Sequence, residues 1–225
     1  MNKAIILNLK TYPESTGEAG ERLCAIAEKV AAGAPKGVEV IACPQSPLLQ
    51  KSCWQLKHGK VFAQGCEAAK LGQSTGAVTP EAVKAAGCAG TLVNHSERRV
   101  SAAEVKEVIA RAGKVGLNVC ACAASVEEGV ALSAFSPWAV AVEPPELIGS
   151  GISVSTSRPE LVSRSVEKIR AANSKCLVLV GAGISTAGDV AKSVELGADG
   201  VLLASAFVKA KDPQALLQEM VEALK

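Results

Sequence analysis

The sequence lacks an excess of charge of either sign. Its 24 Lys and Arg residues nearly balance 22 Asp and Glu residues, so the formal net charge is only +2. The basic residues are scattered along the chain and form no stripe of the kind that binds a phosphate backbone. We therefore expect no nucleic-acid partner, and any anionic ligand should be small and held locally.

Long apolar runs are missing as well. The apolar run near Met1 is too short for a signal peptide, and no other segment reaches the ~18 uninterrupted apolar residues of a membrane span. The sequence therefore predicts a cytoplasmic protein with no membrane partner. It also has no linker, low-complexity tract or charge block, so residues 1–225 are expected to form one domain, with 48% apolar residues to build its core.

Two ligand signatures are incomplete. The segment Gly181-Ala-Gly183 lacks the third glycine of the dinucleotide-binding fingerprint, because Thr186 occupies that place. Cys120 and Cys122 would point to the same side of a strand, but no second Cys or His pair nearby completes a zinc site. We therefore expect no cofactor and no metal. The eight cysteines are spread along the chain, and we interpret them as small buried hydrophobes; disulfides stay open if the source is a hyperthermophile.

What the sequence does have is a regular alternation of apolar runs and helix-like stretches. The apolar runs are centred near Ile5, Val40, Val61, Leu92, Val119, Val140, Leu179 and Leu202. Between them, Ala-, Glu- and Lys-rich stretches with helical periodicity include residues 18–32, 102–112, 159–172 and 213–224, and the predicted N-caps are Thr79, Ser101 and Asp212. Eight strands that alternate with helices fit an α/β fold of the single-domain (β/α)8 barrel type better than an open sheet.

Polar residues follow three of the predicted strands directly. These residues are Asn8-Leu-Lys10, Asn94-His95-Ser96-Glu97 and Glu143. Because the active site of such a barrel lies at the carboxyl ends of its strands, we expect Lys10, His95 and Glu143 to meet at one mouth. Glu143 is followed by a loop rich in proline and glycine, residues 144–151, which suggests a proton-transfer base beside a lid that excludes water.

In order, spacing and strand-end position, these segments resemble the active site of the triosephosphate isomerase family. The resemblance runs along the whole chain and is closest to the short archaeal form. It implies a TIM barrel that interconverts dihydroxyacetone phosphate and D-glyceraldehyde 3-phosphate through an enediol(ate), in glycolysis and gluconeogenesis. It also implies that Glu143 is the base, His95 and Lys10 are the electrophiles, Asn8 supplies a polar contact, and Glu97 is the partner of the lysine.

The substrate phosphate would be bound by backbone N–H groups in turns after the sixth, seventh and eighth strands, of which the first two carry glycine. The candidate residues are Ile148, Gly149, Ser150, Gly183, Ala204 and Ser205. These turns depart from the usual family pattern, in which the lid carries an aromatic residue where this chain has Glu146. The short archaeal enzymes depart in a similar way.

The segment 73–81 resembles the family's third loop, which projects into a neighbouring subunit. The resemblance therefore implies a homo-oligomer, with Thr75 as the residue that reaches across. The short chain, with reduced helices outside the barrel, suggests a tetramer built from dimers. Arg98 and Arg99 would either contribute to that interface or be simple exposed charges.

The sequence leaves two alternative functions open. Another phosphate-binding barrel enzyme could share the glycine-rich turns, but it would not require Lys10, His95 and Glu143 in this arrangement. A catalytically silent barrel could act as a phosphate-binding or scaffold protein, but it would have no need to retain all three. The isomerase interpretation therefore accounts for more of the sequence.

Overall fold

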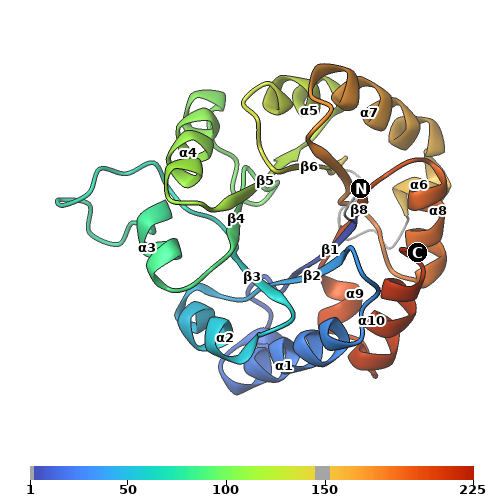
Figure 1. Ribbon diagram of the computed structural model, residues 1–225, viewed down its shortest axis with the longest axis horizontal. Helices are drawn as coiled ribbons and strands as arrows, with labels where there is room; N and C mark the ends of the chain where they lie inside the picture. The colour runs from blue at the N-terminus through green and yellow to red at the C-terminus, as the bar shows by residue number, and fades with distance from the viewer. Residues whose placement is uncertain (1–2, 145–152) are drawn as a thin grey trace.

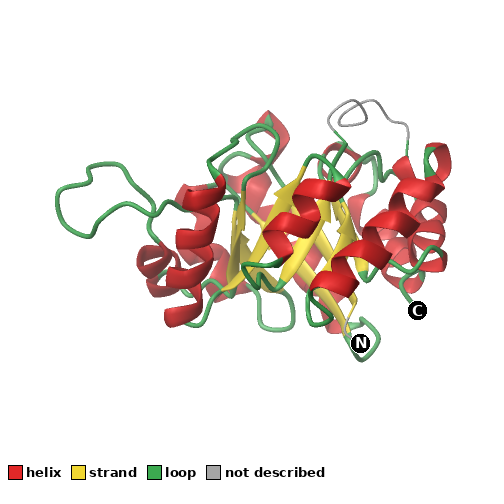
Figure 2. Ribbon diagram, turned by 90° about the horizontal axis from the view of Figure 1, so that it is seen from above, coloured by secondary structure: helices red, strands yellow, loops and turns green. Residues whose placement is uncertain are grey.

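The computed structural model describes residues 3–144 and 153–225, which form a closed barrel of eight parallel strands in sequence order, surrounded by helices (Figures 1 and 2). The strands are β1 (Lys3–Asn8), β2 (Val38–Cys43), β3 (Lys60–Ala63), β4 (Gly90–Val93), β5 (Asn118–Ala123), β6 (Ala139–Val142), β7 (Leu177–Val180) and β8 (Gly200–Leu203). The (β/α)8 barrel predicted from the alternation of patterns is confirmed, and each predicted apolar centre lies in one strand.

Helices occupy the outside of the barrel in Figure 1. They are α1 (Glu18–Ala32), α2 (Leu49–Gln55), α3 (Pro80–Ala85), α4 (Ala102–Lys114), α5 (Val126–Ser133), α6 (Val154–Ser157), α7 (Pro159–Ala172), α8 (Ala187–Glu195), α9 (Ser205–Val208) and α10 (Pro213–Glu222), with short 3-10 turns η1 (Pro13–Ser15) and η2 (Ser46–Leu48). The three predicted N-caps are confirmed, because the side chains of Thr79, Ser101 and Asp212 each accept a hydrogen bond from the first turn.

The predicted helix boundaries hold for α1 and α7 and shift slightly for α4 and α10. Helix α4 continues to Lys114 and ends before Gly116, whose φ of 71° takes the chain out of the helix. Helix α10 stops at Glu222, two residues before the predicted end, near the chain terminus. End residues depend on local capping, which helical periodicity does not resolve.

The strands are buried on both faces because they separate two apolar layers. In β1, Ala4 and Ile6 belong to the cluster inside the barrel, whereas Ile5 and Leu7 belong to the cluster between strands and helices. Inside the barrel, the rings of Phe62 and Trp138 meet edge to face with centroids 5.6 Å apart. The interior is therefore a packed core that supports the strand ends, and not a channel.

One loop projects from the surface of the barrel. Figures 1 and 2 show that the chain between β3 and α3 extends well away from the barrel; this projecting loop, residues 64–79, carries Thr75 in an exposed position.

No helix in the described part of the chain combines the length and hydropathy needed to cross a membrane. All eight cysteines lie in the described residues and are free, and all but Cys53 are buried.

The closure of the barrel gives a prediction at Gly200, the first residue of β8. A Cβ atom there would lie 1.8 Å from the backbone oxygen of Ala4 in β1, so the two strands could not keep their register. We expect Gly200→Ala to lower the free energy of unfolding by about 3 kcal/mol or more, at the upper end of overpacking costs. Urea denaturation measures this. Gly113→Ala is the matched control, because a Cβ at Gly113 meets nothing within 4 Å; equal stabilities of the two variants would contradict the prediction.

Candidate active site

The five predicted catalytic residues lie together at the carboxyl-end mouth of the barrel. Asn8 ends β1, Lys10 follows it, His95 follows β4 and Glu143 follows β6. The Lys10 Nζ is 2.7 Å from the Glu97 Oε1, and the His95 Nε2 is 3.8 Å from the Glu143 Oε2. The closed sheet thus joins groups that are separated by more than half of the sequence.

Lys10 is held in an unusual backbone conformation. Its φ of 47° is in the left-handed region, which costs energy for a residue other than glycine. The Asn8 Oδ1 accepts a hydrogen bond from the Lys10 N–H at 3.0 Å, and the Gln64 Nε2 donates to the Lys10 carbonyl at 2.9 Å and to the Cys43 carbonyl at 3.0 Å. Asn8 therefore acts on the backbone of Lys10, and Gln64 shares that task. Sequence reasoning missed Gln64, although it directly follows β3.

Asn94 fixes the chain at the residue before His95. It has a φ of 62°, and its Nδ2 donates to the Cys122 carbonyl at 2.9 Å and to the Glu128 Oε1 at 3.1 Å. Its Oδ1 accepts from the Val100 N–H at 3.1 Å. Asparagine tolerates the left-handed conformation better than most residues. The identity of residue 94 could therefore have indicated this backbone conformation. The Arg98 N–H donates to the His95 carbonyl at 2.8 Å and so closes a hydrogen-bonded turn after His95.

The environment of His95 favours a neutral imidazole. Burial lowers its pKa, and the nearby Lys10 charge lowers it further, against a weaker opposite effect of Glu97. The Glu97 N–H donates to the His95 Nδ1 at 3.2 Å, so in the neutral ring the proton is on Nε2. That nitrogen is the one that faces Glu143 and can donate a hydrogen bond to a ligand in the mouth.

Glu143 is an unusually buried carboxylate. Its side chain is 2% exposed, and neither carboxylate oxygen has a hydrogen-bond partner among the described residues. Burial raises the pKa of Glu143 to about 8, although the Cys122 thiol and the Lys10 charge act in the opposite direction. A carboxylate with a raised pKa is a stronger base than an exposed one once it is ionised.

Gly181 provides the space for this side chain. A Cβ atom at Gly181, which follows β7, would lie 2.4 Å from the Glu143 Cγ and 2.9 Å from its Oε1. The sequence suggested a phosphate-binding turn around Gly181 and Gly183, and gave no indication that Gly181 makes room for Glu143. Such a packing relation between two strand ends is visible only in the folded structure.

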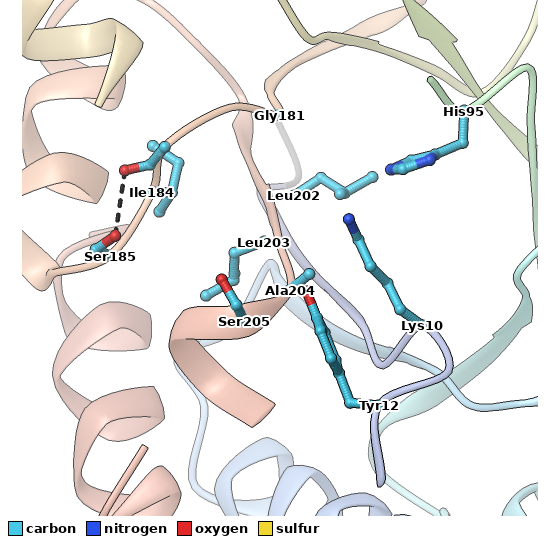
Figure 3. A pocket seen from close by; sticks show the side chains of 11 residues that line it. Lys10, Tyr12, His95, Gly181, Ile184, Ser185, Leu202, Leu203, Ala204 and Ser205 are labelled. Carbon is cyan, nitrogen blue, oxygen red and sulfur yellow. Dashed lines mark hydrogen bonds between the residues drawn. The ribbon is translucent and has the colours of Figure 1, made fainter. Parts of the chain in front are cut away.

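The pocket at this mouth extends from two of the catalytic side chains to the predicted phosphate turns after β7 and β8 (Figure 3). Lys10 and His95 line it together with Gly183, Ala204 and Ser205. Gly183 has a φ of 72°, and Ser205 begins α9. Sequence reasoning missed Tyr12, which also lines the pocket and has the Lys209 Nζ 4.6 Å from its ring centroid. The predicted lid residues Ile148, Gly149 and Ser150 lie outside the described residues.

The two arginines after the His95 segment make ion pairs within the chain. Arg98 pairs with Glu67 of the projecting loop, and Arg99 pairs with Glu128 of α5. Glu128 also accepts from Asn94, so these pairs brace the turn that carries His95. Within residues 3–144 and 153–225, no group of three or more His, Cys, Asp or Glu side chains could hold a metal ion.

Comparison with known proteins decides the family. A sequence model described as "Triosephosphate isomerase" matches residues 3–223. The chain belongs to the triosephosphate isomerase family. Curated triosephosphate isomerases of similar length include that of Methanopyrus kandleri, 44% identical over 98% of this chain and 97% of its own. That of Methanobacterium bryantii is 43% identical over 96% of this chain and 95% of its own, and that of Methanocaldococcus jannaschii 40% identical over 97% and 98%.

The burial of Glu143 predicts a pH-dependent effect on stability. Its folded pKa of about 8 lies above the ordinary value of 4.5, so the folded state keeps the proton longer than the unfolded state. The stability linked to this proton is fully present below pH 4.5 and is lost as the pH rises toward 8. At pH 8 we expect the free energy of unfolding of Glu143→Gln to exceed that of the wild type by about 2–5 kcal/mol, as measured by urea denaturation. Most of this difference should be gone at pH 5. Parallel stability curves across this range would contradict the prediction.

Proposed function

We propose that this member of the triosephosphate isomerase family interconverts dihydroxyacetone phosphate and D-glyceraldehyde 3-phosphate through an enediol(ate). The observation that carries the proposal is the meeting of Lys10, His95 and Glu143, a carboxylate with no hydrogen-bond partner among the described residues, at one mouth beside the turns after β7 and β8. Isomerisation needs a base for a carbon-bound proton and electrophiles for the oxygen that becomes negative. The family match over nearly the whole chain favours this chemistry over a silent barrel or another sugar-phosphate enzyme.

In the proposed reaction, the Glu143 carboxylate removes a proton from C1 of dihydroxyacetone phosphate and returns it to C2. A pKa of about 8 for Glu143 leaves about a tenth of the carboxyl ionised at pH 7 and makes that ionised fraction more basic. The His95 Nε2 and the Glu143 Oε2 are 3.8 Å apart, longer than a hydrogen bond, and a neutral His95 carries no charge to pair with the carboxylate.

The negative charge of the enediolate is stabilised by His95 and Lys10. A neutral His95 donates its Nε2 proton to one substrate oxygen and recovers a proton from the other. Lys10 supplies positive charge, while Glu97 at 2.7 Å fixes its ammonium group and Asn8 fixes its backbone. Because the side chain of Lys10 is only 14% exposed, its charge is weakly screened by water.

The substrate phosphate is bound by backbone N–H groups near Gly183, Ala204 and Ser205. Ser205 lies on the opposite side of the pocket from His95 (Figure 3). We also propose that Ile148, Gly149 and Ser150, which lie outside the described residues, contact the phosphate and that their loop excludes water from the enediolate. We place the enzyme in glycolysis and gluconeogenesis, in the cytoplasm.

A coupled assay tests the proposal. We expect rapid conversion of glyceraldehyde 3-phosphate to dihydroxyacetone phosphate by the wild type and a loss of about a thousandfold or more in kcat for Glu143→Gln, because the base is removed at nearly constant volume. Run in deuterated water, the wild type should place deuterium on the carbon that receives the proton. A wild type that binds substrate without turning it over, or a Glu143→Gln variant of equal activity, would overturn the proposal.

The room that Gly181 leaves for Glu143 gives a second prediction. In Gly181→Ala, the added methyl group overlaps the Glu143 side chain and must displace it from its present position. We expect kcat to fall by about a hundredfold, as for misplacement of a reacting group by about 1 Å. Gly188→Ala in α8 is the control, since a Cβ there meets its nearest neighbour at an ordinary 3.5 Å. Wild-type kcat in Gly181→Ala would mean that the base is not located as described.

We also propose that the chain is a homo-oligomer, a tetramer built from dimers, with Thr75 reaching into a neighbouring subunit. The support is the projecting loop, residues 64–79, which extends away from the barrel and leaves Leu71 67% exposed (Figure 2). The two ends of the projecting loop are joined by a hydrogen bond from the Glu67 backbone N–H to the Val78 carbonyl at 2.8 Å. The tetramer follows from the family resemblance alone.

Sedimentation velocity measures the assembly. We expect a particle of four times the mass of the 22.9 kDa chain, and smaller particles for a Thr75→Arg variant, because a charged side chain cannot be buried unpaired in an interface. Ser74→Arg in the same loop tests whether the effect is specific to Thr75. A wild type that remains a monomer at micromolar concentration would contradict the proposal.

A further inference from the structure

Two cysteines lie in contact far from the active-site mouth. The sulfurs of Cys53, in α2, and Cys88, two residues before β4, are 3.6 Å apart. Cys88 is at the end of β4 opposite to His95, so the catalytic mechanism does not use this pair. Cys53 is also the one cysteine of the eight that is not buried.

The surroundings of the pair leave room for a covalent bond. A disulfide needs a sulfur separation of about 2.05 Å, so the two sulfurs, which are 3.6 Å apart, must approach by about 1.5 Å through rotation of their side chains. Gly87 lies beside them, and a Cβ at Gly87 would be 3.2 Å from the Cys53 Cβ, so its lack of a side chain keeps the space open. Cys53 lies two residues before the end of the short helix α2, where the backbone can adjust.

The two thiols differ in reactivity and in access. The hydrogen bond with Cys88 lowers the pKa of Cys53, whereas the contact with Cys53 and burial raise the pKa of Cys88. The Cys53 side chain is itself only half-buried, whereas Cys88 is buried, so a small oxidant reaches Cys53 first. Cys53 is thus the attacking sulfur and Cys88 the resolving one.

We propose that Cys53 and Cys88 are a redox modification site that closes to an intramolecular disulfide when a small disulfide such as oxidised glutathione is present. The Cys53 thiolate attacks one glutathione sulfur, breaks the S–S bond and releases one glutathione as its thiolate. Cys88 then loses its proton and attacks the Cys53 sulfur, which releases the second glutathione. The two cysteine protons are taken up by the two leaving thiolates, and the net change is the oxidation of two protein thiols and the reduction of one small disulfide.

The bridge would stabilise the fold without changing the chemistry. It closes a loop between residues 35 positions apart, which contains β3, the projecting loop and α3, and so restricts the unfolded chain. It ties α2 to the start of β4, at the end of the barrel away from Lys10, His95 and Glu143. We therefore expect a higher melting temperature for the oxidised protein and an unchanged kcat.

Thiol counting and peptide mapping test the proposal on the full-length protein. After equilibration with oxidised glutathione and unfolding in the presence of iodoacetamide, we expect six alkylated cysteines, the eight of the chain less the two in the bridge. Trypsin should then release a linked pair of peptides, residues 52–57 and 85–98, whose mass is two hydrogens below the sum of the reduced peptides.

Two variants make the test specific. Cys53→Ser and Cys88→Ser should each lose the linked peptides and the gain in melting temperature, whereas Cys66→Ala should retain both. Linked peptides in the wild type support the proposal by themselves if a variant fails to fold. Eight alkylated cysteines after oxidation, glutathione attached to Cys53 without a bridge, or a different cysteine pair in the linked peptides would overturn it.

Discussion

The active site depends on the burial of one carboxylate that has no hydrogen-bond partner among the described residues. Glu143 is 2% exposed, and neither of its oxygens accepts a hydrogen bond within the described part of the chain, so the ionised form is costly and its pKa is about 8. A single strand end cannot create such a site. It requires the closed sheet, in which β5 and β7 flank β6 on either side and Gly181 leaves just enough room. The energy that this burial costs the fold is the origin of the base strength.

The electrophiles are positioned by a different principle, namely strained backbone held by side-chain hydrogen bonds. The described residues include three non-glycine residues with positive φ, and two of these, Lys10 and Asn94, are at the mouth. Asn8 and Gln64 hold the first, while Asn94 holds itself through its contacts with β5 and α5. Lys10 pairs with Glu97 and not with Glu143, so its charge assists the site without being neutralised by the base.

Most of the fold and the catalytic set could be predicted from the sequence, because both follow repeating rules. Period and capping patterns located the strands and the boundaries of α1 and α7, and the strand-end rule predicted that Lys10, His95 and Glu143 share one mouth. Gln64, Tyr12 and the role of Gly181 were missed, since each acts through contacts between strand ends that no local pattern encodes. The loop of residues 145–152 remains a prediction, as it lies outside the described residues.

The most direct test of this account is the pKa of Glu143 in the folded protein. Protein labelled with carbon-13 at the Glu side-chain carboxyl can be titrated by NMR, and the resonance that disappears in Glu143→Gln identifies the residue. We expect a midpoint near pH 8, well above the ordinary 4.5, since burial without a hydrogen-bond partner among the described residues disfavours the charge. A midpoint close to 4.5 would contradict this expectation, because the carboxylate would then be solvated or paired. Burial in the barrel would then not be the cause of its base strength.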